Sequence, residues 1–188
     1  ADVGTGSGAI AIAIKQAFPN WLMVASDISK DALDVAEINF KKTGVSPQVL
    51  LGDSLNPYIE KKINLDILIS NPPYILNKED AQESVINYEP GSALWLDKSD
   101  SVYEKIFRDY KKVKRGPMFM AFEISPDLVT YLTGLMKKYL DHYEYRSRPC
   151  ATFLLFVRKG HNSSDPCPTR QQTAKWRKPP SCHKTSNG

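Results

Sequence analysis

The chain has 188 residues, 41% of them hydrophobic and 24% charged, which is an ordinary composition for a water-soluble globular protein. Its net charge of +4 is unevenly spread: residues 159–188 hold six basic residues and one acidic residue, a charge of +5, which leaves −1 for residues 1–158. The near-neutral charge of residues 1–158 argues against stable nucleic-acid binding. No apolar run approaches the roughly 18 residues of a membrane span, so we expect a cytoplasmic protein.

The apolar pattern alternates between strand-like and helix-like segments. Strands are predicted at the start of the chain and at residues 21–26, 48–51, 65–69, 117–124 and 151–157. Helices are predicted at residues 8–17, 29–44, 102–113 and 129–140, with Ser29 as an N-cap and Gly44 as a helix end. This alternation predicts an α/β fold with a mostly parallel sheet, whose ligands bind at the carboxyl ends of the strands, near the point where the strand order reverses.

The first of these strand ends carries a glycine-rich loop. Gly4, Thr5, Gly6, Ser7 and Gly8 join the first strand to the first helix. The glycines permit a tight turn and a close approach of backbone to ligand, beside a helix N-terminus. The loop also fits a dinucleotide fingerprint, so by itself it leaves a nicotinamide-dependent dehydrogenase open, although no evident hydride-transfer constellation accompanies it.

Acidic residues follow the next two predicted strands. Asp27 stands at the end of the second strand, where a carboxylate can accept hydrogen bonds from ribose hydroxyls. Asp53 follows the third strand, where an adenine lying across the strand ends would need an acceptor for its exocyclic amine. The structural alternatives are a helix-terminal acid at Asp27 and a solvated loop residue at Asp53.

The fourth strand ends in the tetrapeptide Asn71-Pro72-Pro73-Tyr74. Neither proline can donate a hydrogen bond to a strand ladder, and each disfavours helix for the residue before it, so the strand stops abruptly. On the tetrapeptide alone, a rigid turn is a sufficient explanation.

The chain resembles the class I S-adenosylmethionine-dependent methyltransferases in the order of its motifs. A glycine loop comes first, acids follow strands two and three, and the tetrapeptide follows strand four. More narrowly, residues 2–123 resemble the release factor glutamine methyltransferases, and Glu89-Pro90 and Ala93-Leu94 add to this likeness. The resemblance implies a Rossmann-like fold, with a mostly parallel seven-stranded sheet, helices on both faces and an antiparallel C-terminal strand.

The resemblance also implies the reaction and its donor site. A methyl group would pass from S-adenosyl-L-methionine to the side-chain amide nitrogen of the glutamine in the GGQ motif of a peptide chain release factor, with no metal involved. The donor would lie against the backbone from Gly4 to Gly8, with Asp27 at the ribose, Asp53 and Ser54 near the adenine, and Ile28 against one adenine face.

On the substrate side, the resemblance assigns the tetrapeptide to the target amide. The Asn71 side chain and the Pro72 carbonyl would accept its two N–H groups, and Asn71 would touch the donor as well. Pro73 would stiffen the loop with Pro72, and Tyr74 would pack beside the amide. Two prolines hold such acceptors in place before the substrate arrives, which aligns a weakly nucleophilic nitrogen for attack.

The chain departs from that family in ways that leave other functions open. It has no N-terminal helical domain and begins within the first predicted strand, so we expect the carboxyl-terminal part of a longer protein, and Ser125 stands where a glycine is usual. The alternatives are a different glutamine target such as a ribosomal protein, an exocyclic base amine of nucleic acid, or an inactive fragment that still binds S-adenosylmethionine.

Two regions are expected from composition and pattern. Residues 1–158 are predicted to form the methyltransferase domain, with its first strand truncated, and residues 159–188 a disordered basic tail rich in Ser, Thr, Pro and Lys. Cys150, Cys167 and Cys182 are odd in number and widely spaced, which predicts neither a disulfide framework nor a metal site.

Overall fold

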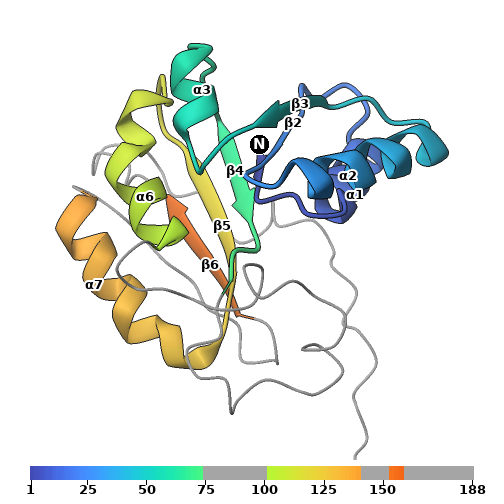
Figure 1. The fold of residues 1–188 in the computed structure, drawn as a ribbon. Coiled ribbons are helices and arrows are strands. Elements are labelled where there is room, and N and C mark those ends of the chain that lie inside the picture. Colours follow the sequence, from blue (N-terminus) through green and yellow to red (C-terminus); the bar gives the residue numbers. More distant parts are fainter. Residues whose placement is uncertain (74–100, 141–152, 159–188) are drawn as a thin grey trace, which may run out of the picture.

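The computed structural model describes residues 1–73, 101–140 and 153–158. These ranges form one six-stranded sheet in the order β3-β2-β1-β4-β5-β6 (Figure 1). The first five strands pair in parallel, and β6 pairs antiparallel with β5. The strands are β1 (Asp2–Val3), β2 (Val24–Asp27), β3 (Gln48–Leu51), β4 (Ile67–Ser70), β5 (Phe119–Ile124) and β6 (Phe153–Arg158). The predicted α/β class and antiparallel C-terminal strand are confirmed; the predicted count of seven strands is not tested by these ranges.

Helices cover both faces of the sheet. In Figure 1, α1 and α2 lie on one side of the strands, and α6 and α7 lie on the other. The side chains agree, because successive strand residues point to opposite faces. Val24 belongs to the hydrophobic cluster that contains the buried residues of α6 and α7, and Ala25 belongs to the cluster with those of α1 and α2. The helices are α1 (Ala9–Ala17), α2 (Lys30–Thr43), α3 (Asn56–Glu60), α6 (Val102–Asp109) and α7 (Val129–Tyr139), with 3₁₀ turns at Tyr110–Lys112 and Pro126–Leu128.

The ends of α2 are set by the two residues that the sequence marks for them. The Ser29 hydroxyl accepts a hydrogen bond from the Ala32 amide at 3.2 Å, as an N-cap does. Gly44 ends the helix in the left-handed conformation, with φ of 70°. The helix therefore starts directly after the end of β2, which brings its N-terminus to the carboxyl edge of the sheet.

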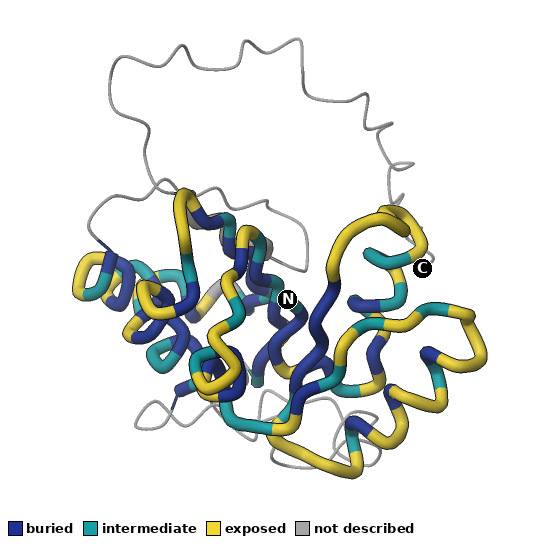
Figure 2. The backbone as a smooth tube through the Cα atoms, turned by 90° about the horizontal axis from the view of Figure 1, so that it is seen from above, coloured by how far each residue is buried: buried dark blue, intermediate teal, exposed yellow. Residues whose placement is uncertain are grey.

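The larger of two hydrophobic cores lies on the α6 and α7 face. Phe122 of β5 is fully buried, and its ring centroid lies 5.6 Å from that of Tyr103 and 5.5 Å from that of Phe107, both on α6. Figure 2 shows the central strands as buried and much of the outer helical surface as exposed. The core thus fixes α6 against the strands that end at the candidate site.

Most predicted bounds agree with the structure to within two residues, and three elements differ by more. The second strand begins at Val24 rather than residue 21, because Trp21 and Leu22 are exposed and Trp21 stacks on Phe18, with ring centroids 4.3 Å apart. The short helix α3, which was not predicted, has a proline in its first turn. The helix predicted to reach residue 113 changes to a 3₁₀ turn after Asp109.

The described residues, 1–73, 101–140 and 153–158, contain five α-helices. None of the helices in these ranges has both the length and the hydropathy that a membrane crossing requires. Within the same ranges, no group of three or more His, Cys, Asp or Glu side chains is arranged to hold a metal ion.

Candidate functional site

The strand registers bring the predicted motifs to one edge of the sheet. Val3 pairs with Ser26 of β2 and with Ser70 of β4, so the residues that follow these three strands lie side by side. The strand order reverses between β1 and β4, because β2 and β3 lie on one side of β1 and β4 and β5 on the other. The glycine loop and Asn71 therefore meet at the topological switch point, where parallel α/β sheets bind ligands.

The glycine loop is tied down on its protein side and open on the other. The amides of Gly4 and Thr5 donate to the Ser26 carbonyl at 2.8 and 2.9 Å. Gly4 and Gly6 have φ values of +72° and +55°, and a Cβ added to either would meet nothing within 4 Å. Positive φ explains why these positions are glycine, and the open space leaves their backbone accessible to a ligand.

Asp27 supports the loop and the next helix at the same time. Its Oδ2 accepts from the Gly6 amide at 2.9 Å, and its Oδ1 accepts from the Ser29 amide at 2.9 Å. The helix-terminal role that the sequence left open is therefore present. Because each carboxylate oxygen has two acceptor sites and Asp27 is half-buried, the side chain can still accept hydrogen bonds from a ligand.

Gly8 has a packing role that the sequence analysis did not separate from ligand binding. It is buried with φ of +84°, and an added Cβ would lie 2.5 Å from Phe40 Cε1 and 3.3 Å from Ala36 Cβ. This glycine lets α1 approach α2 closely, whereas Gly4 and Gly6 face open space. The Ser7 side chain is exposed, and its backbone carbonyl accepts from Asn39 Nδ2 at 2.9 Å.

Asp2 is a loop-organising residue that the sequence analysis missed. It is fully buried, and its Oδ2 accepts from Thr5 Oγ1 at 2.7 Å and from the Ala11 amide at 3.1 Å. Burial raises the pKa of the Asp2 carboxyl, and these two hydrogen bonds act in the opposite direction. The sequence already indicated this role for Asp2, because an acid within an apolar strand is buried and needs hydrogen-bond donors nearby.

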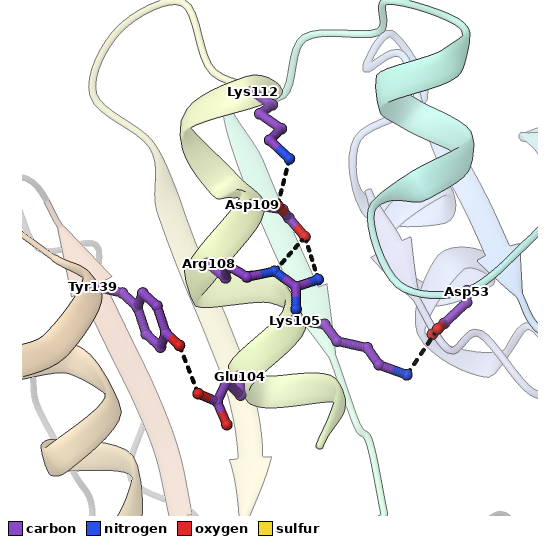
Figure 3. Close-up of polar contacts among 7 residues, drawn as sticks. All are labelled: Asp53, Glu104, Lys105, Arg108, Asp109, Lys112 and Tyr139. Carbon is purple, nitrogen blue, oxygen red and sulfur yellow. Dashed lines mark hydrogen bonds and ion pairs between the residues drawn. The ribbon is translucent and has the colours of Figure 1, made fainter. Parts of the chain in front are cut away.

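The loop after β3 holds Asp53 beside the same edge. Asp53 Oδ2 forms an ion pair with Lys105 Nζ of α6 at 2.8 Å (Figure 3). Ser54 follows in the left-handed conformation, with φ of 51°, and its buried Oγ has no hydrogen-bond partner among the described residues. An unsatisfied buried hydroxyl next to a carboxylate suits a polar ligand group, as the resemblance predicts for an adenine.

A buried tyrosine from α3 supports the end of β2 beneath this site. The Tyr58 hydroxyl donates to Ser26 Oγ at 2.9 Å, and the Ser26 carbonyl is the acceptor for the glycine loop. Burial raises the pKa of the Tyr58 phenol, so the group stays neutral and remains a donor. The short helix that was not predicted thus contributes to the shape of the predicted loop.

The residues after β4 end the strand as predicted. The Ser70 hydroxyl donates to the Val3 carbonyl at 2.6 Å, which joins β4 to β1 just before the tetrapeptide. Asn71 is exposed, Pro72 is buried and Pro73 is intermediate, whereas Tyr74 lies outside the described residues.

Ile28, predicted against an adenine face, has 68% of its surface exposed beside Asp27. The structure therefore brings the described candidates to one edge, and Ile28 belongs to neither hydrophobic core.

Comparisons with known proteins find similar sequences among the methyltransferases. The family model described as "Methyltransferase small domain" matches residues 1–89. The release factor glutamine methyltransferase of Enterococcus faecalis is 40% identical over 128 residues, which cover 65% of this chain and 45% of the relative. That of Bacillus subtilis is 41% identical over 127 residues, which cover 65% and 44%. The chain spans about half the length of the curated relatives it matches.

Solved structures share the fold at low sequence identity. The ribosomal protein L11 methylase of Lactobacillus delbrueckii subsp. bulgaricus has a TM-score of 0.56 at 18% identity, over 85% of this chain and 68% of that one. SMU.776, a putative methyltransferase complexed with SAH, has a TM-score of 0.59 at 11% identity, over 84% and 44%. The chain therefore has the class I methyltransferase fold, and the resemblance of its sequence to the release factor glutamine methyltransferases is confirmed.

Proposed function

We propose that this chain carries the catalytic site of a protein-glutamine N-methyltransferase, which transfers a methyl group from S-adenosyl-L-methionine to the glutamine side-chain amide in the GGQ motif of a peptide chain release factor. One observation carries the proposal: the pairing of Val3 with Ser70, which sets the glycine loop beside Asn71 and Pro72 at the switch point. The identity of about 40% to the named relatives supports this substrate class.

The residues at this edge fit the donor. Gly4 and Gly6 present open backbone, Asp27 retains acceptor capacity, and the buried Ser54 hydroxyl lacks a partner among the described residues. When bound, S-adenosylmethionine supplies a methyl group on a positively charged sulfur, which makes it reactive without a metal or a covalent nucleophile. The loop, Asp27 and the Asp53–Ser54 pair would hold the cofactor.

The tetrapeptide would act on the amide by position. An amide nitrogen is a poor nucleophile, because its lone pair is delocalised into the carbonyl. The Asn71 side chain and the Pro72 carbonyl would accept its two N–H groups, fix its orientation and favour positive charge developing on nitrogen. Asn71 is exposed at the end of a strand that Ser70 ties to β1, so it is accessible and its backbone is anchored.

Two substitutions separate the proposed roles of donor and substrate binding. Asp27→Ala removes the ribose acceptor and two loop hydrogen bonds, so we expect affinity for S-adenosylhomocysteine to fall about tenfold or more. Asn71→Ala should leave much of that affinity and lower methyl transfer to a GGQ peptide by about 100-fold or more. Calorimetric titration and transfer of a radiolabelled methyl group measure the two quantities.

Matched controls are available on the same elements. Asp34→Ala removes an exposed acid of α2 that pairs with Lys30, and Asn64→Ala removes an exposed asparagine before β4, at the opposite end of that strand from Asn71. Neither control should change donor affinity or transfer. Failure of the folded, unsubstituted chain to bind S-adenosylhomocysteine would refute the proposal, and equal loss of donor binding in both test variants would refute this division of roles.

A further inference from the structure

The Asp53 carboxylate forms an ion pair with a lysine of α6, a helix that is distant in the sequence. Its Oδ2 lies 2.8 Å from Lys105 Nζ, 52 residues further along the chain (Figure 3). The Lys105 side chain is only 16% exposed, and that of Asp53 is 31% exposed. By contrast, the side chains of Lys112 and Lys138, which pair with the two α6 acids Asp109 and Glu104, are about 60% exposed. A lysine loses much rotamer freedom when it is buried, so this contact differs from an ordinary surface ion pair.

The backbone around Asp53 is already fixed without the lysine. The Gly52 amide donates to the Asp27 carbonyl at 2.9 Å, and the Asp53 carbonyl accepts from the Asn56 amide at 3.0 Å. Ser54 has φ of 51°, a conformation that is unfavourable for a residue other than glycine and persists only where its surroundings impose it. These contacts fix the path of the loop, but they leave the direction of the Asp53 carboxylate undetermined.

Lys105 stands on a helix that is anchored on both sides of it. Glu104 accepts from Tyr139 and Lys138 of α7 at 2.6 and 2.9 Å, and Ile106 is fully buried in the larger core. These contacts hold α6 in place against α7 and the larger core, and they thereby fix the position of the Lys105 ammonium group. One carboxylate oxygen of Asp53 is engaged there, and the other accepts no hydrogen bond from the described residues.

We infer that Lys105 is a positioning residue for donor recognition: it orients Asp53 so that its second carboxylate oxygen accepts the exocyclic amine of adenine, and it thereby sets the preference for an adenine base. This inference rests on the proposed function. A carboxylate whose direction is fixed by an ammonium favours a base with an N–H₂ group and disfavours one with a carbonyl oxygen at the same position.

The test compares two ligands that differ at that position. S-adenosylhomocysteine carries the amine, and S-inosylhomocysteine carries a carbonyl oxygen instead. Calorimetric titration of the 188-residue chain should show tighter binding of the adenosyl ligand, by about tenfold or more. In Lys105→Met, which keeps a similar stem without the charge, this ratio should fall towards one, mainly because adenosyl binding weakens. Lys105→Arg should restore much of the ratio, because it retains a donor to Asp53.

The controls separate positioning from general support of the fold. Lys138→Met removes an ion pair to Glu104 on the same helix, away from Asp53, and should leave the ratio unchanged. Asp53→Ala should reduce the ratio as far as Lys105→Met does. If Lys105→Met does not fold, Lys105→Gln carries the test, with thermal unfolding used to check folding.

The outcomes distinguish this inference from the proposed function. If the unsubstituted chain binds neither ligand, the proposed function fails. If it binds both and prefers the adenosyl ligand, but the folded Lys105 variants keep the full ratio, the positioning role alone is refuted. A gain in adenosyl affinity on removal of the lysine would also refute it, because Lys105 would then compete with the base for Asp53.

Discussion

Gly8 shows how one residue type serves two purposes within a single loop. Gly4 and Gly6 have open space where a side chain would start, but a Cβ on Gly8 would lie 2.5 Å from Phe40 Cε1 and 2.8 Å from its Cζ. A side chain at Gly8 would therefore force α1 away from α2 and strain a backbone with φ of +84°.

We predict that Gly8→Ala destabilises the protein by about 2–4 kcal/mol, the sum of overpacking and left-handed strain. Urea denaturation measures this loss. The matched control is Gly134→Ala, at an exposed position of α7 where an added Cβ meets nothing within 4 Å. That substitution should stabilise by about 0.5–1 kcal/mol, because alanine favours helix. A Gly8→Ala protein as stable as the original would show that the two helices do not pack as described.

At the scale of elements, α6 connects the larger core to the candidate site. Its Glu104 joins it to α7, its Lys105 joins it to the loop after β3, and its buried Asp109 pairs with Arg108 and with Lys112 of the following 3₁₀ turn (Figure 3). The hydrogen bonds from Tyr139 and Lys138 lower the pKa of Glu104, and those from Arg108 and Lys112 lower the pKa of Asp109. Both carboxylates are therefore favoured in their ionised form by folding.

A pH dependence of stability follows from the lowered pKa of Glu104. A carboxyl group with a lowered pKa in the folded state contributes stability above its unfolded pKa, about 4.3 for Glu, and loses it as the pH falls through the folded-state value. We predict that Glu104→Gln is less stable than the original protein at pH 7, by about 0.5–1 kcal/mol, and that the difference shrinks towards zero near pH 3.

Chemical denaturation of both proteins at several pH values measures this difference. Asp2, Asp109 and the remaining acids titrate in both proteins, so their contributions cancel in the comparison. A difference that stays constant from pH 7 to pH 3 would contradict the assigned interaction, because it would not depend on the charge of Glu104.

At the scale of the whole molecule, the sheet divides two cores of unequal size. The smaller one joins α1 and α2 through Ala11, Ala36 and Phe40, and the larger one gathers the aromatic side chains of β5 and α6. Most buried apolar surface therefore lies on the face that carries Lys105, whereas the glycine loop leads into a helix of the other face. Global stability should therefore depend most on the aromatic side chains of that face.

We predict that Phe122→Ala destabilises the protein by about 3–5 kcal/mol, because it removes a fully buried ring that packs against those of Tyr103 and Phe107 and leaves a cavity. The control, Phe18→Ala, removes an exposed ring that stacks on Trp21 and should cost about 1 kcal/mol. Urea denaturation measures both losses. Similar losses at the two positions would show that the larger core does not dominate stability.

The sequence alone determined the features that depend on neighbouring residues. Ser29 and Gly44 cap α2, and Pro72 and Pro73 follow the end of β4, through backbone conformation and hydrogen bonds within a few residues. The glycines of the loop permit positive φ, which is also a local property. For this reason the class of fold and the order of the motifs could be predicted without coordinates, and with them the resemblance to the release factor glutamine methyltransferases.

Only the tertiary structure decided which distant groups meet. The pairing of Val3 with Ser70, the approach of Phe40 to Gly8 and the ion pair of Lys105 with Asp53 join residues 32 to 67 positions apart. No local pattern specifies such contacts, because they depend on strand register and helix packing across the sheet. The sequence could therefore name most of the residues at the candidate site, whereas the buried support from Asp2 and the orientation of Asp53 by Lys105 follow from the folded arrangement.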